Sequence, residues 1–157
     1  MIIRNACPKD IGRLIDLLHE VLEIHAKIRP DIFVSGTTKY TAEELEDILK
    51  DNDRPIYVAS DDSDRVIGYA FCQIKDSSAS PNMVPFKSIF IDDLCVDSSC
   101  RGQHIGEKLF DHVKEEAKKL GCYEITLNVW TGNESAERFY EKLGMKTKER
   151  QMELILD

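Results

Sequence analysis

The chain has 157 residues, of which 42% are hydrophobic and 32% charged, so we expect one globular domain over residues 1–157. Its formal net charge of −8 at pH 7 makes a nucleic-acid backbone an unfavourable partner. No apolar run approaches the roughly 20 residues of a membrane helix, and the five cysteines include no Cys-x-x-Cys pair that would indicate a zinc site or a disulfide framework. We therefore expect a cytoplasmic protein with reduced thiols, no metal, and no nucleic-acid or membrane partner.

The first half of the chain is predicted to form a strand, two helices and a hairpin. Apolar residues at three- and four-residue spacing predict the first helix, which must end near Arg29-Pro30 because proline disfavours a helical residue before it. A capping-box pattern that starts at Thr41 opens the second helix. In chain order, these elements cover residues 1–6, 10–25, 41–49, 56–60 and 66–75.

The second half is predicted to begin, after a loop over residues 76–85, with a strand that is buried on both faces. The elements that follow the loop are the strand Phe86–Asp97, the helix Gln103–Leu120, the strand Tyr123–Val129, a helix from Asn133 to Gly144, and one or two strands over Met145–Leu156. A strand, helix and strand in succession form a right-handed crossover, so the strands Phe86–Asp97 and Tyr123–Val129 should be parallel. The fold class is therefore mixed α/β or α+β, with a single sheet of six to seven strands and helices on both faces.

The segment from Ile91 to Gly106 carries the chemistry, because a buried strand runs through a short turn directly into a helix. A helix start leaves about four N–H groups without partners and holds a partial positive charge, so it can bind a phosphate or diphosphate. Gly102 allows the turn, Gly106 allows a close approach, and Arg101 adds a full charge. The glycines do not fit a nucleoside-triphosphate loop or a dinucleotide fingerprint. Taken alone, the segment is also compatible with a plain strand–helix turn.

Two motifs give the chain a resemblance to a known family. Arg101-x-x-His104-x-Gly106 resembles motif A of the GNAT superfamily of N-acyltransferases, Q/R-x-x-G-x-G/A, with His104 in place of the first glycine. This departure matters if the position requires a positive φ. Downstream, Asn133-x-x-Ala136-x-x-Phe139-Tyr140 and Gly144-Met145 resemble the second signature of the family. The order of elements also fits from Met1 to Leu156.

The resemblance implies that acetyl-CoA lies in a V between the strands Phe86–Asp97 and Tyr123–Val129. It implies that an amide near Leu94 polarises the thioester carbonyl and that Tyr140 protonates the departing thiolate. The same resemblance implies a set of cofactor-binding residues on the first of these strands, in the turn and on the last helix: Leu94, Cys95, Val96, Arg101, Gly102, Gln103, His104, Ile105, Gly106, Asn133, Ala136 and Tyr140.

Transfer to an amine requires a base, because an alkyl amine of pKa ~10.4 is about 99.9% protonated at pH 7. Asp92 and Asp93 are candidates, since a carboxylate in an apolar run is costly unless it has a role or a partner. In a regular strand they point to opposite faces. We favour Asp92, which would share a face with Leu94 and Val96; Asp93 is the alternative, and it could also be a structural cap or ion pair. His25 and Tyr40 fall in the region that lines the acceptor pocket in such folds.

The primary hypothesis is thus an N-acetyltransferase that moves an acetyl group from acetyl-CoA to a primary amine by direct attack in a ternary complex. The acceptor is a small molecule or a peptide amine. The alternative is a catalytically inactive acyl-CoA-binding module that acts as a sensor, which Tyr140 and the carboxylate pair disfavour. A third interpretation is a domain with no such ligand. A homodimer is a further expectation from the family, although no sequence feature locates its interface.

Overall fold

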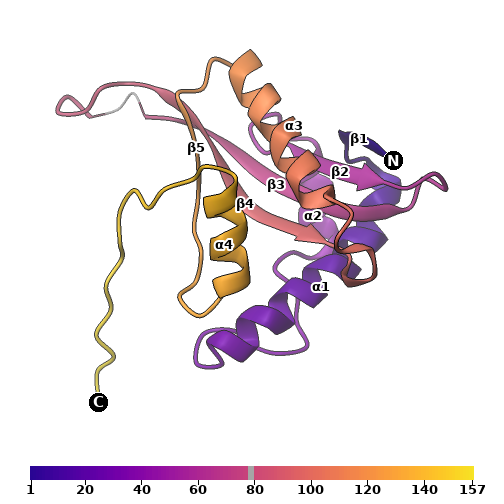
Figure 1. Cartoon of the computed structure of the whole chain (residues 1–157), viewed down its shortest axis with the longest axis horizontal. Helices are drawn as coiled ribbons and strands as arrows, with labels where there is room; N and C mark the ends of the chain where they lie inside the picture. Colours follow the sequence, from indigo (N-terminus) through magenta and orange to yellow (C-terminus); the bar gives the residue numbers. More distant parts are fainter. Residues whose placement is uncertain (78–79) are drawn as a thin grey trace.

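The computed structural model describes residues 1–77 and 80–157 (Figure 1). The helices and strands are β1 (Ile2–Asn5), α1 (Ile11–Ile28), α2 (Ala42–Leu49), β2 (Ile56–Ser60), β3 (Val66–Asp76), β4 (Lys87–Val96), α3 (Ile105–Lys119), β5 (Glu124–Leu127) and α4 (Glu134–Lys142). Single 3₁₀ turns over Pro8–Asp10 and Ser98–Cys100 precede α1 and α3. Most of the predicted elements are therefore confirmed, with shifts of a few residues at their ends.

The strands form one sheet in the order β1-β2-β3-β4-β5. Neighbours are antiparallel from β1 to β4, whereas β4 and β5 are parallel, with Ser88 opposite Glu124 and Ile91 opposite Leu127. The predicted crossover through α3 is confirmed. The expectation of six to seven strands is wrong, because the described residues contain five. One or two strands were expected over Met145–Leu156, which is wrong. A strand needs a neighbour for its main-chain groups, and this segment extends away from the sheet (Figure 1).

Helices cover both faces of the sheet, as predicted (Figure 1). Side chains alternate along a strand, so Tyr69 and Phe71 of β3 pack with leucines of α1 and α2, whereas Ala70 and Cys72 pack with α3. The side chain of Tyr140 from α4 lies against the α3 side of the core. None of the helices in residues 1–77 and 80–157 is long and apolar enough to cross a membrane.

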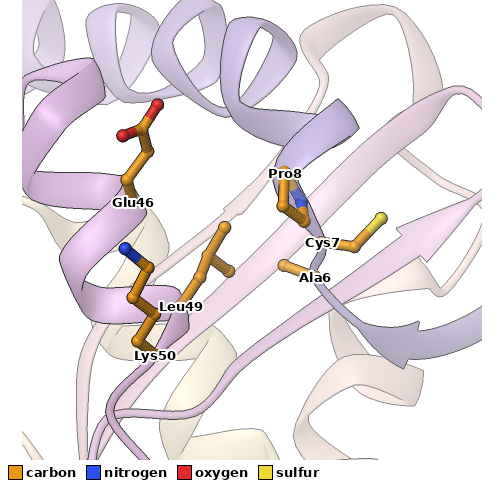
Figure 2. A pocket seen from close by; sticks show the side chains of 6 residues that line it. All are labelled: Ala6, Cys7, Pro8, Glu46, Leu49 and Lys50. Atoms are coloured by element: carbon orange, nitrogen blue, oxygen red, sulfur yellow. The ribbon is translucent and has the colours of Figure 1, made fainter.

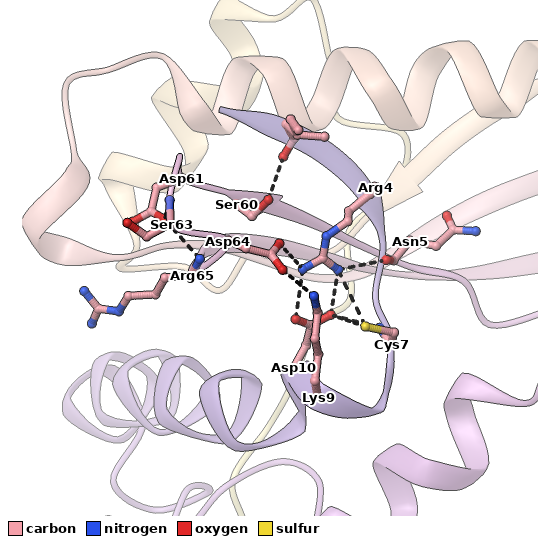
Figure 3. Close-up of polar contacts among 11 residues, drawn as sticks. Arg4, Asn5, Cys7, Lys9, Asp10, Ser60, Asp61, Ser63, Asp64 and Arg65 are labelled. Atoms are coloured by element: carbon pink, nitrogen blue, oxygen red, sulfur yellow. Dashed lines mark hydrogen bonds and ion pairs between the residues drawn. The ribbon is translucent and has the colours of Figure 1, made fainter.

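A network of ion pairs fixes the start of α1 against the strands (Figure 3). The guanidinium of Arg4 in β1 binds the buried carboxylate of Asp10 through both terminal nitrogens, at 2.8 and 3.1 Å, and also reaches Asp64 at 3.0 Å. Lys9 pairs with Asp64 as well. Because Asp64 lies in the β2–β3 turn, these contacts hold the first turn of α1 over the end of the sheet that carries the functional site.

Candidate active site

The strand β4 pairs with the parallel strand β5 only along its first half. Their register ends where Ile91 lies opposite Leu127, and β4 then continues to Val96. The edge of β4 that faces β5 is therefore open over residues 92–96. An open strand edge presents N–H and C=O groups that an extended ligand can bind as if it were another strand. These residues include Leu94, Cys95 and Val96, for which the family resemblance implies contact with a pantetheine arm.

The turn after β4 is held by the buried side chain of Asp97. Its carboxylate accepts hydrogen bonds from the N–H and the hydroxyl of Ser99, at 2.9 and 2.8 Å, and pairs with Arg13 of α1. The hydrogen bond from the Ser99 N–H is the main reason that the pKa of Asp97 lies below its ordinary value. An ionised Asp97 thus connects α1 to the turn and sets where α3 begins.

The start of α3 presents main-chain N–H groups beside the open edge. His104 is its N-cap residue and has a φ of 59°, in the left-handed region, and Gly102 has a φ of 84°. The position that departs from the glycine pattern thus does require a positive φ. The first helical bond runs from the Lys108 N–H to the His104 carbonyl at 3.1 Å, so earlier N–H groups remain available at the helix end. The exposed His104 ring lies near Glu107, with Nδ1 3.0 Å from Oε2.

Gly106 brings the start of α3 close to α4. A Cβ at this position would lie 3.1 Å from the ring of Phe139 and 3.6 Å from a methyl group of Val96. The side chain of Ile105 is buried and anchors the same turn to the core. The end of β4 and the starts of α3 and α4 therefore meet at one place.

Helix α4 provides the far wall of this opening. Asn133 caps the helix, its Oδ1 accepting from the Ala136 N–H at 3.3 Å. Tyr140 packs against the α3 side of the core, in the same hydrophobic cluster as Leu94 and Leu127, with its ring 5.1 Å from that of Phe139. Burial raises the pKa of the Tyr140 phenol, and the nearby Asp93 carboxylate raises it further. The phenol is therefore protonated at neutral pH.

A β-bulge in β4 places the two candidate carboxylates. Phe71 lies opposite Asp93 and the next residue, Cys72, lies opposite Ile91, so that Asp92 is the extra residue. The expectation that Asp92 and Asp93 point to opposite faces is wrong, because a bulge interrupts the alternation of a strand. Both carboxylates bind tyrosines on the side of the sheet that α1 and α2 cover.

Asp92 is held by the connection between α1 and α2. Lys39 Nζ lies 2.8 Å from Oδ1 of Asp92, and the Tyr40 hydroxyl donates to Oδ2 at 2.5 Å. The Tyr40 ring in turn stacks on Phe71 at 5.5 Å. Burial, followed by the bond to Asp92, raises the pKa of Tyr40. The carboxylate of Asp92 is therefore both ion-paired and hydrogen-bonded.

Asp93 has no ion pair with a cation among the described residues. The Tyr69 hydroxyl donates to its Oδ2 at 2.7 Å. Burial raises the pKa of Asp93 to about 6, and the hydrogen bond from Tyr69 opposes part of that increase. A carboxylate with this pKa is largely ionised at pH 7 and can still accept a proton, which is the property of a general base.

The family model described as "Acetyltransferase (GNAT) family" matches residues 18–145, which include every element of this site. The chain belongs to the GNAT acetyltransferase family. The resemblance noted in the sequence is thus confirmed at the level of the family.

Named relatives of this GNAT chain act on amines. Over 71 residues it is 37% identical to a glucosamine 6-phosphate N-acetyltransferase from Arabidopsis thaliana, a match that covers 45% of this chain and only 46% of that protein. It is 26% identical over 153 residues to a thialysine N-epsilon-acetyltransferase from Bos taurus, which covers 92% of this chain and 83% of the relative. The chain thus spans less than half the length of the plant enzyme.

A solved structure of a mutant BH1408 protein from Bacillus halodurans superposes on this GNAT chain with a TM-score of 0.95 and 31% identity. The superposition covers 99% of both chains, so it takes in the extended residues after α4 as well. This likeness supports the fold described above.

The site residues predicted from the sequence lie around this opening, but the residues that support them were not predicted. Lys39 and Tyr69 belong to no sequence motif, because each binds a carboxylate that is distant in sequence. Tyr40 was predicted only as part of the acceptor region. Cys95 contributes main chain to the open edge, but its buried thiol, whose pKa burial raises to about 12, is a packing group.

One pocket of the structure contains none of the predicted site residues. It has a volume of about 400 Å³ and lies between the β1–α1 connection and α2, where Glu46, Leu49 and Lys50 face Ala6, Cys7 and Pro8 (Figure 2). It borders β1, at the opposite edge of the sheet from β5. We therefore place the candidate active site at the opening between β4 and β5 and not in this pocket.

Proposed function

We propose that this chain transfers an acetyl group from acetyl-CoA to a primary amine in a ternary complex. The observation that carries the proposal is the open edge of β4 after Ile91, which leads through the turn over residues 97–104 to the uncapped N–H groups of α3. A thioester on an extended arm with a diphosphate at one end matches that arrangement. The names of the relatives, which describe N-acetylation of two amines, support the same reaction class.

In this proposal the diphosphate binds the main-chain amides of residues 101–106, with Arg101 adding a positive charge. The pantetheine arm lies along Leu94, Cys95 and Val96 and contacts Asn133 and Ala136 on the other side. The N–H near Leu94 polarises the thioester carbonyl, because a fixed donor stabilises the negative charge that develops on that oxygen.

The proposed base is Asp93. Its raised pKa of about 6 and its position on the bulge support this role. Asp92, which the sequence favoured, is occupied by Lys39 and Tyr40 and positions the loop between α1 and α2. Asp93 takes a proton from the ammonium group of the acceptor, directly or through water, and the neutral nitrogen then attacks the carbonyl carbon.

The proposed acid is Tyr140. Its raised pKa keeps the phenol protonated at neutral pH, and its place in the same hydrophobic cluster as Leu94 supports donation to the thiolate that leaves. The C–S bond breaks and sulfur takes the phenolic proton. The acylated nitrogen loses its second proton, which reaches the tyrosinate through water, and Asp93 releases the first proton to solvent. We also propose a reducing cytoplasm as the setting, because Cys72 and Cys95 are buried as free thiols.

The test is release of free CoA thiol from acetyl-CoA with a panel of amines that contains an amino-sugar phosphate, a diamino acid and a peptide with a free N-terminus. Mass spectrometry of the acceptor identifies the product. We expect at least one amine to accelerate thiol release, and Tyr140→Phe to lower kcat about 100-fold. Tyr123→Phe, at a position that is 75% exposed, is the matched control and should retain full activity. If acetyl-CoA binds and no amine accelerates release, the chain is an acyl-CoA-binding module.

A further inference from the structure

A lysine of this chain lies beside the candidate active site. Lys39 belongs to the connection between α1 and α2, and its Nζ lies 2.8 Å from Oδ1 of Asp92 and 3.5 Å from the Asp92 carbonyl oxygen. Asp92 is the first residue of the open edge of β4. The other lysine ion pairs among the described residues involve carboxylates outside β4. Of these paired lysines, Lys39 is therefore the one next to the edge where the proposed function places the thioester.

The ammonium group of Lys39 is within reach of that thioester. Successive residues of a strand are about 3.3 Å apart, so the N–H near Leu94 that would polarise the thioester carbonyl lies about 7 Å from Asp92 along β4. Lysine carries its ammonium on a flexible four-carbon stem. The Lys39 side chain is 43% exposed, so water can replace Asp92 as its partner. Rotation about the side-chain bonds of Lys39 can therefore bring Nζ from Asp92 to the carbonyl carbon.

Neighbouring contacts hold the main chain of the loop when the Lys39 side chain moves. The Tyr40 hydroxyl donates to Oδ2 of Asp92 at 2.5 Å, and the Tyr40 ring stacks on Phe71 at 5.5 Å. The Thr38 hydroxyl donates to the Tyr40 carbonyl at 2.9 Å. These contacts flank Lys39 on both sides in the sequence and do not use its amine. The amine can therefore leave Asp92 without a rearrangement of the loop.

Lys39 presents the same chemical group as the proposed acceptor, an alkyl amine beside a carboxylate. We propose that Lys39 is an acetylation site of this chain, modified by the chain's own active site when no other amine is bound. This role rests on the proposed function, because it uses the same acetyl-CoA and the same edge of β4. An amine held at the site by its own chain has a high effective concentration, so it competes with free amines that are scarce.

The step is an acetyl transfer in which atoms and charges balance. The Lys39 ammonium gives one proton to Asp92 before it rotates, and Asp92 passes that proton to solvent. The neutral nitrogen attacks the thioester carbon, the C–N bond forms and the C–S bond breaks. Sulfur takes the phenolic proton of Tyr140, and the second proton of the nitrogen returns to Tyr140 through water. The products are an amide on Lys39, free CoA and one proton in solvent.

Acetylation of Lys39 should slow transfer to other amines. It removes the positive charge of the side chain, so Asp92 loses the cation that neutralises it. Of the groups that face Asp93, the Tyr69 hydroxyl and Lys39 lower its pKa, whereas Asp92 raises it. In the acetylated chain the proposed base is therefore less ionised at neutral pH, and turnover of amines should decrease.

The test is mass spectrometry of the full chain after incubation with acetyl-CoA alone, followed by peptide mapping. We expect the added mass of one acetyl group at Lys39, at a rate that does not depend on protein concentration, since the reaction occurs within one chain. Tyr140→Phe should slow this modification about 100-fold. Lys39→Arg keeps the positive charge and should lose the added mass. Lys50→Arg, the matched control, lies in the pocket at the other edge of the sheet and should leave the modification unchanged.

The amine panel described above distinguishes failure of this role from failure of the proposed function. Turnover of an amine by a chain whose Lys39 stays unmodified would overturn this role and leave the proposed function intact. Acetyl groups on Lys39 and Lys50 at equal rates would show chemical acetylation only and would also overturn it, as would a rate that rises with protein concentration. Neither turnover nor modification, with acetyl-CoA bound, would contradict both proposals. The wild-type peptide map decides these cases even if a variant fails to fold.

Discussion

Asp92 and Asp93 are neighbours in β4, yet they accept hydrogen bonds from tyrosines that are 29 positions apart, Tyr40 and Tyr69. The bulge brings both carboxylates to one side of the sheet, where their different partners give the two residues different charge environments. Asp92 is neutralised by Lys39, whereas Asp93 is left with a raised pKa of about 6. Each of these features leads to a measurable difference between the two residues.

Asp93→Asn should remove activity and increase stability at neutral pH. The pKa of Asp93 in the folded chain exceeds its unfolded value of about 3.9. Between these values the folded state binds a proton that the unfolded state has lost, so the free energy of unfolding decreases as pH rises from about 4 to 6 and stays lower above 6. Asparagine does not titrate, so the variant avoids this decrease in the free energy of unfolding. We expect urea unfolding at pH 7.5 to show a gain of about 1–2 kcal/mol, and kcat to fall about 100-fold or more.

Asp92→Asn is the matched control for that experiment. It leaves Lys39 without its ion-pair partner, so stability should decrease rather than increase. If Asp93→Asn destabilises the chain as Asp92→Asn does, Asp93 is a structural group and the assignment of the base is wrong.

The pH dependence of activity should follow Asp93. With acetyl-CoA and amine below saturation, kcat/KM reports groups of the free enzyme and the free substrates. We expect kcat/KM to increase with pH through a midpoint near 6, because only the ionised carboxylate accepts a proton. A profile of kcat/KM without a step between pH 5 and 7 would mean that Asp93 is not the base.

His104→Gly should stabilise the chain. A non-glycine residue in the left-handed region costs roughly 1–2 kcal/mol, and His104 has a φ of 59°. The lost contact with Glu107 is a surface one of small value, since the His104 side chain is 68% exposed. We expect a net gain of about 0.5–1 kcal/mol in urea unfolding, after the extra freedom of glycine in the unfolded chain is included. A loss of stability would mean that the imidazole contact outweighs the strain at this position.

Gly106→Ala should weaken acetyl-CoA binding. The added Cβ would lie 3.1 Å from Phe139, so the start of α3 and the wall formed by α4 must separate. We expect a loss of about 1–2 kcal/mol in stability and a higher KM for acetyl-CoA. Gly12→Ala in α1, where nothing lies within 4 Å of the added carbon, is the control and should stabilise the helix by about 0.5–1 kcal/mol. An unchanged KM for acetyl-CoA in Gly106→Ala would mean that the close approach of Gly106 to Phe139 does not affect cofactor binding.

The elements of the fold could be predicted because their signals are local. Leu14, Leu18 and Leu22 repeat with the period of a helix, and the run from Phe86 is typical of a buried strand. The motif around Arg101 and Gly106 located the turn, and the position of its mismatch, His104, has a positive φ in the structure.

The bulge at Asp92 and the extended path of residues 146–157 could not be predicted, because both depend on which strand lies alongside. Asp92 is the extra residue only because Cys72 of the neighbouring strand lies opposite Ile91. The sequence of one strand does not specify that register. The Lys39–Asp92 pair joins residues 53 positions apart. Met145–Leu156 has the alternation of a strand, yet no strand among the described residues pairs with it.

The central claim is tested most directly by a crystal structure of the chain with acetyl-CoA bound. The account predicts the diphosphate at the N–H groups between Arg101 and Gly106, the pantetheine arm along Leu94–Val96, and the thioester sulfur next to the Tyr140 hydroxyl. Acetyl-CoA in the pocket near Leu49, or elsewhere on the surface with the opening between β4 and β5 empty, would contradict it.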